Sequence, residues 1–369
     1  MTTYLIRRTI SGFIVLVLAS FLIYSILTLA PGGPLDQIKF ATAGTGRVIL
    51  SEEEIERLKA AWKLDTPYPL NYFKWLFSTD ERDLTTLRGY EIVPRGIDVQ
   101  IGDFRLRGTG VLTGDLGDSL VVQRGMGVVE VMGARLGNTL ILMSSSLLLA
   151  LLIAFPIGII SAIRQYSKLD YAVTTFSFFG LSMPTFWLGL MLIIFLAVLP
   201  RQWREMNGWT WLPYLPTGGI TDVGRENDII NRIYHLVLPV TVLAFVNIAG
   251  WSRYIRSSML EVLRQDYVRT AWAKGLSMRA VILKHALRNA LIPLITILAL
   301  ALPGLVSGAI ITETVFAYAG MGQLYFEAVS RADTPLAMGF LMITTSLVIL
   351  ANMLADIMYA VVDPRIRYS

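Results

Sequence analysis

Six long apolar runs without a charged residue constrain the fold of this 369-residue chain more than any other feature. A helix needs roughly 20 apolar residues to cross a hydrocarbon core about 30 Å thick, and a charge at the bilayer centre costs at least about 2.5 kcal/mol. The sequence therefore predicts an all-α integral membrane protein with six transmembrane helices, the second and third of which are kinked at Pro156 and Pro184. The predicted spans are residues 9–35, 136–163, 171–200, 233–252, 289–312 and 334–355.

The composition agrees with a membrane protein and excludes several kinds of chemistry. Hydrophobic residues make up 54% of the chain and charged residues 16%, whereas soluble domains carry about a quarter charged residues. Cysteine is absent, which excludes disulfides, thiolate metal sites and cysteine nucleophiles. His235 and His285 are the two histidines, too few for most zinc sites. The first apolar run is longer than the core of a signal peptide, so we expect a retained anchor helix.

The distribution of charge predicts the orientation. The N-terminal tail, residues 164–170, residues 253–288 and the C-terminal tail hold 14 Lys and Arg against five acids, and the opposite face holds 18 against 22. Positive charge gathers on the cytoplasmic side, so we expect a multi-pass protein of the inner or plasma membrane with both termini cytoplasmic. The basic charge then reflects this asymmetry and contact with anionic lipid, and predicts no nucleic-acid partner.

Two segments between the spans are long enough to have structure of their own. The outer segment, residues 36–135, has a helix signal where Ser51 precedes an acidic first turn. It also alternates apolar and polar residues on both sides of Gly102 and Asp103, which predicts a small β-hairpin. The cytoplasmic segment, residues 253–288, predicts a short helix over 267–274 that ends at Gly275, with Ser277 capping the next helix.

Two stretches of the cytoplasmic segment are recognisable. Residues 266–277 read DYVRTAWAKGLS and residues 285–293 read HALRNALIP, and both resemble the coupling loop of permease subunits from the dipeptide, oligopeptide and nickel branch of ATP-binding-cassette (ABC) importers. The chain departs from the family pattern at Gly33, Gly137 and Ala319, and residues 78–110 have no counterpart in it. Further stretches that resemble the family, in order, are residues 31–34, 114–119, 182–186, 238–239, 313–316 and 363–365.

The resemblance implies a type I ABC importer fold, with a tail and first helix in 1–35, an outer insertion in 36–135 and a core permease domain in 136–369. It implies a second permease subunit, two ATPase subunits that hold ATP and Mg²⁺, and an extracytoplasmic solute-binding protein. Peptides are the expected substrate, with nickel and oligosaccharides left open. Glu313 and Phe316 are candidates for an outer gate. The residues implied to couple the chain to the ATPase are Asp266, Tyr267, Arg269, Ala271, Ala273, Lys274 and Gly275.

Two other functions deserve a test. Residues 117–120 read GDSL, the nucleophile block of one esterase class, yet the Asp-x-x-His motif that would supply the base for Ser119 is absent. His285 is expected on the opposite side of the membrane, and His235 has no obvious acid to orient it. An ion-driven carrier also fits six spans, but such carriers place acids inside the spans, where this chain has none. A Gly-Lys pair is absent as well, so the chain has no Walker A loop and its energy source lies on another subunit.

Overall fold

The computed structural model describes residues 2–29, 69–77, 98–101, 104–107, 111, 114–119, 121–290, 292–331 and 333–362. The chain divides into two compact units. The larger unit consists of Met1–Leu5, Arg135–Leu324 and Leu347–Ser369, and the smaller of Ile6–Ala134 and Tyr325–Ser346. Each unit is described separately below.

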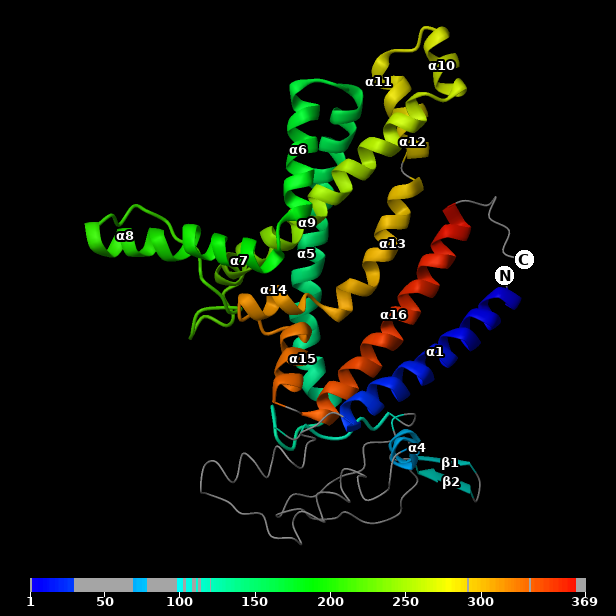
Figure 1. Ribbon diagram of the computed structural model, residues 1–369, viewed down its shortest axis with the longest axis vertical. Helices are drawn as coiled ribbons and strands as arrows, with labels where there is room; N and C mark the ends of the chain where they lie inside the picture. The colour runs from blue at the N-terminus through cyan, green and yellow to red at the C-terminus, as the bar shows by residue number, and fades with distance from the viewer. Residues whose placement is uncertain are drawn as a thin grey trace. The chain divides into compact units, whose positions relative to one another are not determined.

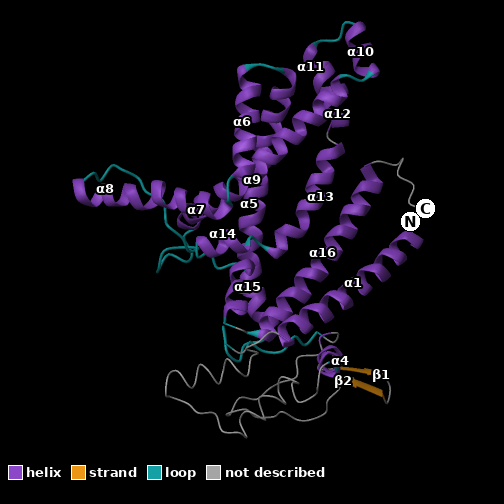
Figure 2. Cartoon of the chain, viewed as in Figure 1, coloured by secondary structure: helices purple, strands orange, loops and turns teal. Residues whose placement is uncertain are grey.

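The described elements are helical except for two short strands (Figures 1 and 2). In chain order they are α1 (Thr2–Leu29), α4 (Leu70–Phe77), β1 (Asp98–Ile101), β2 (Phe104–Arg107), α5 (Val128–Ile163), α6 (Lys168–Ser182), α7 (Thr185–Ile193), the π-helical segment η2 (Ile194–Val198), α8 (Leu199–Asn207), α9 (Ile229–Leu263), α10 (Asp266–Ala273), α11 (Met278–Ala280), the π-helical segment η3 (Val281–Ala286), α12 (Leu287–Ala290), α13 (Ile292–Ser307), α14 (Ile310–Val315), α15 (Met321–Ser330) and α16 (Thr334–Val362).

Five helices in the described part of the chain are long and apolar enough to cross a membrane. α5 and α9 have 36 and 35 residues, so each is more than about 50 Å long and extends beyond a hydrocarbon core of about 30 Å. The corresponding spans predicted from the sequence, residues 136–163 and 233–252, are shorter than these two helices. The five segments are Ile6–Ile26, Val128–Ile163, Thr185–Asn207, Ile229–Leu263 and Thr334–Leu354.

The predicted third span, residues 171–200, is two helices. α6 ends at Ser182, Met183 is extended, and α7 begins directly after Pro184. Proline lacks an N–H and disfavours a helical conformation in the residue before it, so the predicted kink is a complete break. The helix that starts there runs through η2 into α8 and leads away from α6 (Figure 1).

The predicted fifth span, residues 289–312, is also interrupted. α13 ends at Ser307, and Gly308 follows with a φ of +75°, a conformation that residues with a Cβ rarely adopt. α14 starts two residues later and carries Glu313. The sequence signal at Gly308 was a single glycine in an apolar run, which does not by itself predict a break.

Small side chains let the helices of the larger unit approach closely. A Cβ built on Gly158 of α5 would lie 2.8 Å from the carbonyl oxygen of Ser252 in α9, and one on Gly180 of α6 would lie 2.7 Å from the Ala249 Cβ. The hydroxyls of Ser177 and Ser252 lie 3.2 Å apart between α6 and α9. This small-residue packing is typical of helices that associate within a bilayer.

The smaller unit joins the first helix to part of the outer insertion. Tyr72 of α4 is buried, its hydroxyl lies 2.8 Å from the hydroxyl of Ser20 in α1, and Tyr24, Leu76 and Met338 complete the cluster around it. β1 and β2 pair antiparallel from Asp98–Arg107 to Ile101–Phe104. The predicted turn at Gly102 and Asp103 and the predicted helix after Ser51 lie outside the described residues.

Candidate functional site

The knob, residues 266–280, consists of α10, a tight turn and α11, and it follows the end of α9 (Figure 1). α10 ends at Ala273, Gly275 has a φ of +76°, and the Ser277 hydroxyl accepts a hydrogen bond from the N–H of Ala280 at 3.4 Å. The predicted order of helix, glycine turn and capped helix is therefore confirmed. No atom lies within 4 Å of a Cβ built at Gly275, so the backbone conformation alone selects glycine there.

One face of α10 packs on its own chain. Val268 and Ala271 are 0% and 5% exposed, and they pack with Val281 of η3 and with Val262 and Leu263 at the end of α9. Ala271, implied by the resemblance to meet a partner, thus lies in the base beneath α10. The buried contacts fix the short helix, which at eight residues would be unstable alone.

The opposite face of α10 is exposed and combines aromatic with charged side chains. Tyr267 and Trp272 are 41% and 43% exposed, and Leu276 and Met278 in the turn and α11 add apolar surface. Gln265 holds the N-cap position of α10, and the Asp266 side chain is 97% exposed, 3.6 Å from Arg269. Ala273, Lys274 and Gly275 are also exposed. Exposed aromatic side chains beside charges are typical of protein contact surfaces.

Glu313 lies in a buried polar cluster. Its carboxylate, 0% exposed, accepts hydrogen bonds from the Thr139 hydroxyl at 3.1 Å and from the N–H groups of Ala309 and Gln323 at 3.3 and 3.0 Å. Backbone donors and one threonine hydroxyl therefore hold the Glu313 carboxylate. Glu313 thereby fastens α14 and the start of α15 to α5.

Phe316 and its neighbours are equally buried. The Phe316 ring packs with Leu142 and Leu238, and its carbonyl oxygen accepts the N–H of Gly219 at 2.8 Å. Tyr318 donates to the carbonyl oxygen of Asn138 at 3.1 Å. We call Asn138, Thr139, Glu313, Phe316 and Tyr318 the outer cluster. Sequence reasoning missed Asn138 and Thr139, because nothing in the local pattern links them to residues about 180 positions later.

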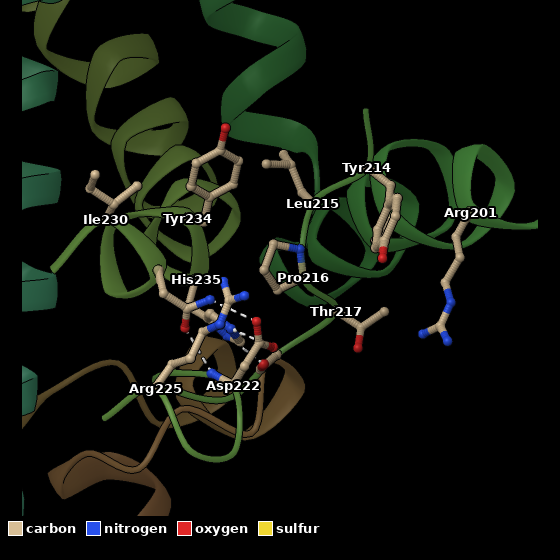
Figure 3. Close-up of a pocket in the computed structure, with 13 residues that line it drawn as sticks. Arg201, Tyr214, Leu215, Pro216, Thr217, Asp222, Arg225, Ile230, Tyr234 and His235 are labelled. Atoms are coloured by element: carbon tan, nitrogen blue, oxygen red, sulfur yellow. Dashed lines mark hydrogen bonds and ion pairs between the residues drawn. The ribbon is translucent and has the colours of Figure 1, made fainter. Parts of the chain in front are cut away.

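A cavity of about 440 Å³ lies between η2, α8, the loop over 214–225 and the start of α9 (Figure 3). His235 is buried against it, with Nδ1 2.8 Å from the carbonyl oxygen of Gly218 and Nε2 3.3 Å from Asp222. The sequence showed no acid to orient His235, and the structure corrects this: Asp222 does so. Hydrogen bonds from Asn231 and then His235 lower the pKa of the Asp222 carboxyl.

Ser119, the residue of the esterase-like block, is not a nucleophile in this structure. It is 0% exposed, its hydroxyl donates to Asp333 at 2.5 Å, and the N–H of Gln123 donates to that hydroxyl at 2.9 Å. Asp333 also accepts the N–H groups of Val121 and Val122. The hydrogen bond from Ser119 to Asp333 connects this block to the segment directly before α16. Within the part of the chain that the structure describes, no group of three acidic or histidine side chains is placed to hold a metal ion.

Comparisons with known proteins point to one family. A family model described as the binding-protein-dependent transport system inner membrane component matches residues 154–368. The chain is 38% identical over 368 residues to the oligopeptide transport system permease protein AppB of Bacillus subtilis, which covers 100% of both chains. It is 36% identical over 269 residues to the dipeptide transport system permease protein DppB of Escherichia coli K12, over 70% of this chain and 79% of that one. An inward-facing structure of the MetNI methionine ABC transporter aligns with a TM-score of 0.47 and 17% identity, over 64% of this chain and 97% of that one.

Proposed function

Because the chain belongs to the family of binding-protein-dependent transport system inner membrane components, we propose that it is the permease subunit of an ATP-driven importer of peptides. The observation that carries the substrate class is the 38% identity with an oligopeptide permease protein over the full length of both chains. A permease of this kind is a transport component and works with ATPase subunits and a solute-binding protein. In our proposal two ATPase subunits and a second, similar permease complete the complex, and ATP and Mg²⁺ bind only to the ATPase subunits.

The knob is the proposed contact with the ATPase. Its exposed face offers charged and aromatic groups, and its buried face, through Val268 and Ala271, rests on the end of α9. A short helix supported in this way can transmit a displacement without absorbing it. The proposed contact residues are Asp266, Tyr267, Arg269, Ala273 and Lys274, and Gly275 sets the direction of α10.

The outer cluster supports a second role in the same cycle. Gly308 separates α13 from α14, and Glu313 and Phe316 hold the α14 segment against its neighbours. We propose that α14 is an outer gate, held closed in this arrangement, and that alternating access opens it when the knob is displaced. In this proposal Glu313 and Phe316 are buried and hold α14 in its closed position.

The chain is proposed to lie in the cytoplasmic membrane with both termini and the knob inside. The support is the charge asymmetry of 14 basic against five acidic residues on that face. The absence of cysteine permits a direct test with Asp98→Cys and Ser277→Cys and an impermeant maleimide in intact cells, whose outer membrane, where they have one, is first opened. Labelling of Asp98→Cys alone supports this orientation, whereas labelling of Ser277→Cys alone reverses it.

The transport proposal is tested by purifying the intact complex with its partners and reconstituting it in proteoliposomes. Radiolabelled trialanine should accumulate only when ATP and the binding protein are both supplied, and mass spectrometry should identify ATPase subunits in the complex. Nickel ions and maltotriose are the comparison solutes. Uptake of either in place of trialanine would contradict the substrate class, and uptake driven by an ion gradient without ATP would contradict the ABC mechanism.

A further inference from the structure

A partly buried ion pair joins the first turn of α6 to α9. Arg256 donates from Nε to Oδ1 of Asp170 at 2.5 Å and from Nη2 to Oδ2 at 2.8 Å. The Asp170 side chain is 4% exposed and that of Arg256 is 23% exposed. Two parallel hydrogen bonds between a guanidinium and a carboxylate fix orientation as well as distance, so α9 is held in one register against the start of α6.

Asp170 also accepts hydrogen bonds from α5 and from the turn between α5 and α6. The Ser161 hydroxyl of α5 donates at 2.5 Å and the N–H of Tyr166 in the turn at 2.9 Å. The turn itself is unusual, because Tyr166 has a φ of +63° without being glycine, which costs free energy that the surrounding contacts must offset. The hydrogen bond from Arg256 lowers the pKa of the Asp170 carboxyl despite its burial, so the carboxylate stays charged at neutral pH. One carboxylate therefore ties α5, the turn and α9 together.

The anchored part of α9 leads directly to the knob. Arg256 lies seven residues before the end of α9 at Leu263, about two helical turns. Between them, Ser258 donates to the carbonyl oxygen of Ala290 in α12 at 3.2 Å. Val262 and Leu263 then form part of the base of α10. The helix that Arg256 fixes is thus the same one on which the knob rests.

We propose that Asp170 and Arg256 are positioning residues for energy coupling, which make α5, α6 and the end of α9 one rigid lever behind the knob. The inference rests on the proposed function of α10 as the helix that meets the ATPase. A push on α10 is then delivered to three helices at once. Without the pair, the last turns of α9 bend and absorb the displacement before it reaches α5 and α6.

The test uses the complete reconstituted complex with a binding protein loaded with trialanine. Asp170→Asn removes the charge, Arg256→Lys keeps the charge but loses the two-pronged geometry, and Ser161→Ala removes one supporting donor. Arg201→Gln is the matched control, because it breaks an ion pair with Glu205 that is more than 60% exposed on both sides. Two quantities are measured: stimulation of ATP hydrolysis by the loaded binding protein, and the distance distribution between spin labels at Lys168→Cys in α6 and at Arg264→Cys, an exposed position at the end of α9.

Stimulation should fall by about 2- to 30-fold in Asp170→Asn, the range expected for residues that modulate coupling. The fall should be smaller in Arg256→Lys and smallest in Ser161→Ala, and the label distances should broaden in the same order while Arg201→Gln stays unchanged. Wild-type stimulation and a narrow distance in an assembled Asp170→Asn complex would overturn the inference. If that variant does not assemble, the same two readouts in Arg256→Lys and Ser161→Ala decide. A wild-type complex that lacks ATPase subunits would instead refute the proposed function itself.

Discussion

The knob and the outer cluster are built in opposite ways. The knob takes its shape from neighbours in sequence: the amide of Asn289 donates to the hydroxyl of Tyr267, 22 residues earlier, at 2.7 Å. In the outer cluster, Glu313 meets Thr139 across 174 residues and Tyr318 meets Asn138 across 180. The knob leaves its polar and aromatic groups exposed, whereas the cluster buries them and satisfies them internally.

This difference predicts that substitutions in the outer cluster affect the stability of the fold, whereas substitutions in the knob affect coupling to the partner. A buried polar group that loses its partner costs much more than an exposed one, so changes in the outer cluster should lower the free energy of unfolding. Changes in the knob remove surface that only a partner needs. We therefore expect the two regions to respond differently to substitutions of similar size.

The largest expected loss of stability follows Glu313→Ala. This substitution removes the acceptor of the buried Thr139 hydroxyl and of the partly buried N–H groups of Ala309 and Gln323, each at a cost of about 1 kcal/mol or more. Thermal unfolding in detergent should therefore show a loss of about 3 kcal/mol or more. Glu205→Gln, at an exposed acid, should stay within about 0.5 kcal/mol of wild type. An equal loss of unfolding free energy in Glu313→Ala and Glu205→Gln would contradict the claim that buried polar groups stabilise the fold more than exposed ones.

A second, smaller loss is expected for Ser119→Ala. The change leaves Asp333 with the backbone N–H groups of Val121, Val122 and Leu336 and removes one hydroxyl bond, and the N–H of Gln123 loses its acceptor. We expect a loss of about 1–3 kcal/mol in the free energy of unfolding and wild-type peptide uptake at low temperature. Assay of ester hydrolysis provides the check on function. A hydrolytic activity in wild type that disappears in Ser119→Ala would restore the esterase hypothesis.

Gly275→Val should lower the free energy of unfolding only slightly but should strongly reduce coupling to the ATPase subunits. A β-branched residue at a φ of +76° costs on the order of 1 kcal/mol or more, and no neighbour clashes with the new side chain. That strain tilts α10, so the variant should insert in the membrane and pair with the second permease but lose the ATPase subunits or the stimulation of hydrolysis. Gly208→Val is the matched control, since Gly208 has a φ of +67° and equally open space far from the knob in sequence. Retained coupling in Gly275→Val, or equal loss in Gly208→Val, would refute the role of the turn.

The sequence predicted what is local and missed what is distant. Charge-free runs marked the membrane helices, and Gly275 with Ser277 located the knob, because each signal lies within a few residues of the structure it determines. Glu313 could be singled out but not placed, since Thr139 comes near it only in the fold. The acid that contacts His235 is close to it in sequence. Asp222 stands in the loop just before α9, 13 residues upstream, so the local sequence contained this signal.

The smallest expected effect concerns Asp222 and pH. Its carboxyl has a folded-state pKa below the ordinary value of 3.8, because Asn231 donates a hydrogen bond to the ionised form and the His235 ring lies beside it. A lowered folded-state pKa means that the stabilisation is complete above about pH 5 and is lost as the pH falls through 3.8 and below. The side chain is 59% exposed, so solvent screening limits the contribution to less than about 1 kcal/mol. Thermal unfolding of wild type and Asp222→Asn should therefore differ slightly at pH 6, and the difference should shrink as the pH falls below 3.8. A difference that widened on acidification would mean that the hydrogen bonds favour the protonated carboxyl, and the loop beside the cavity would then be held by a neutral group.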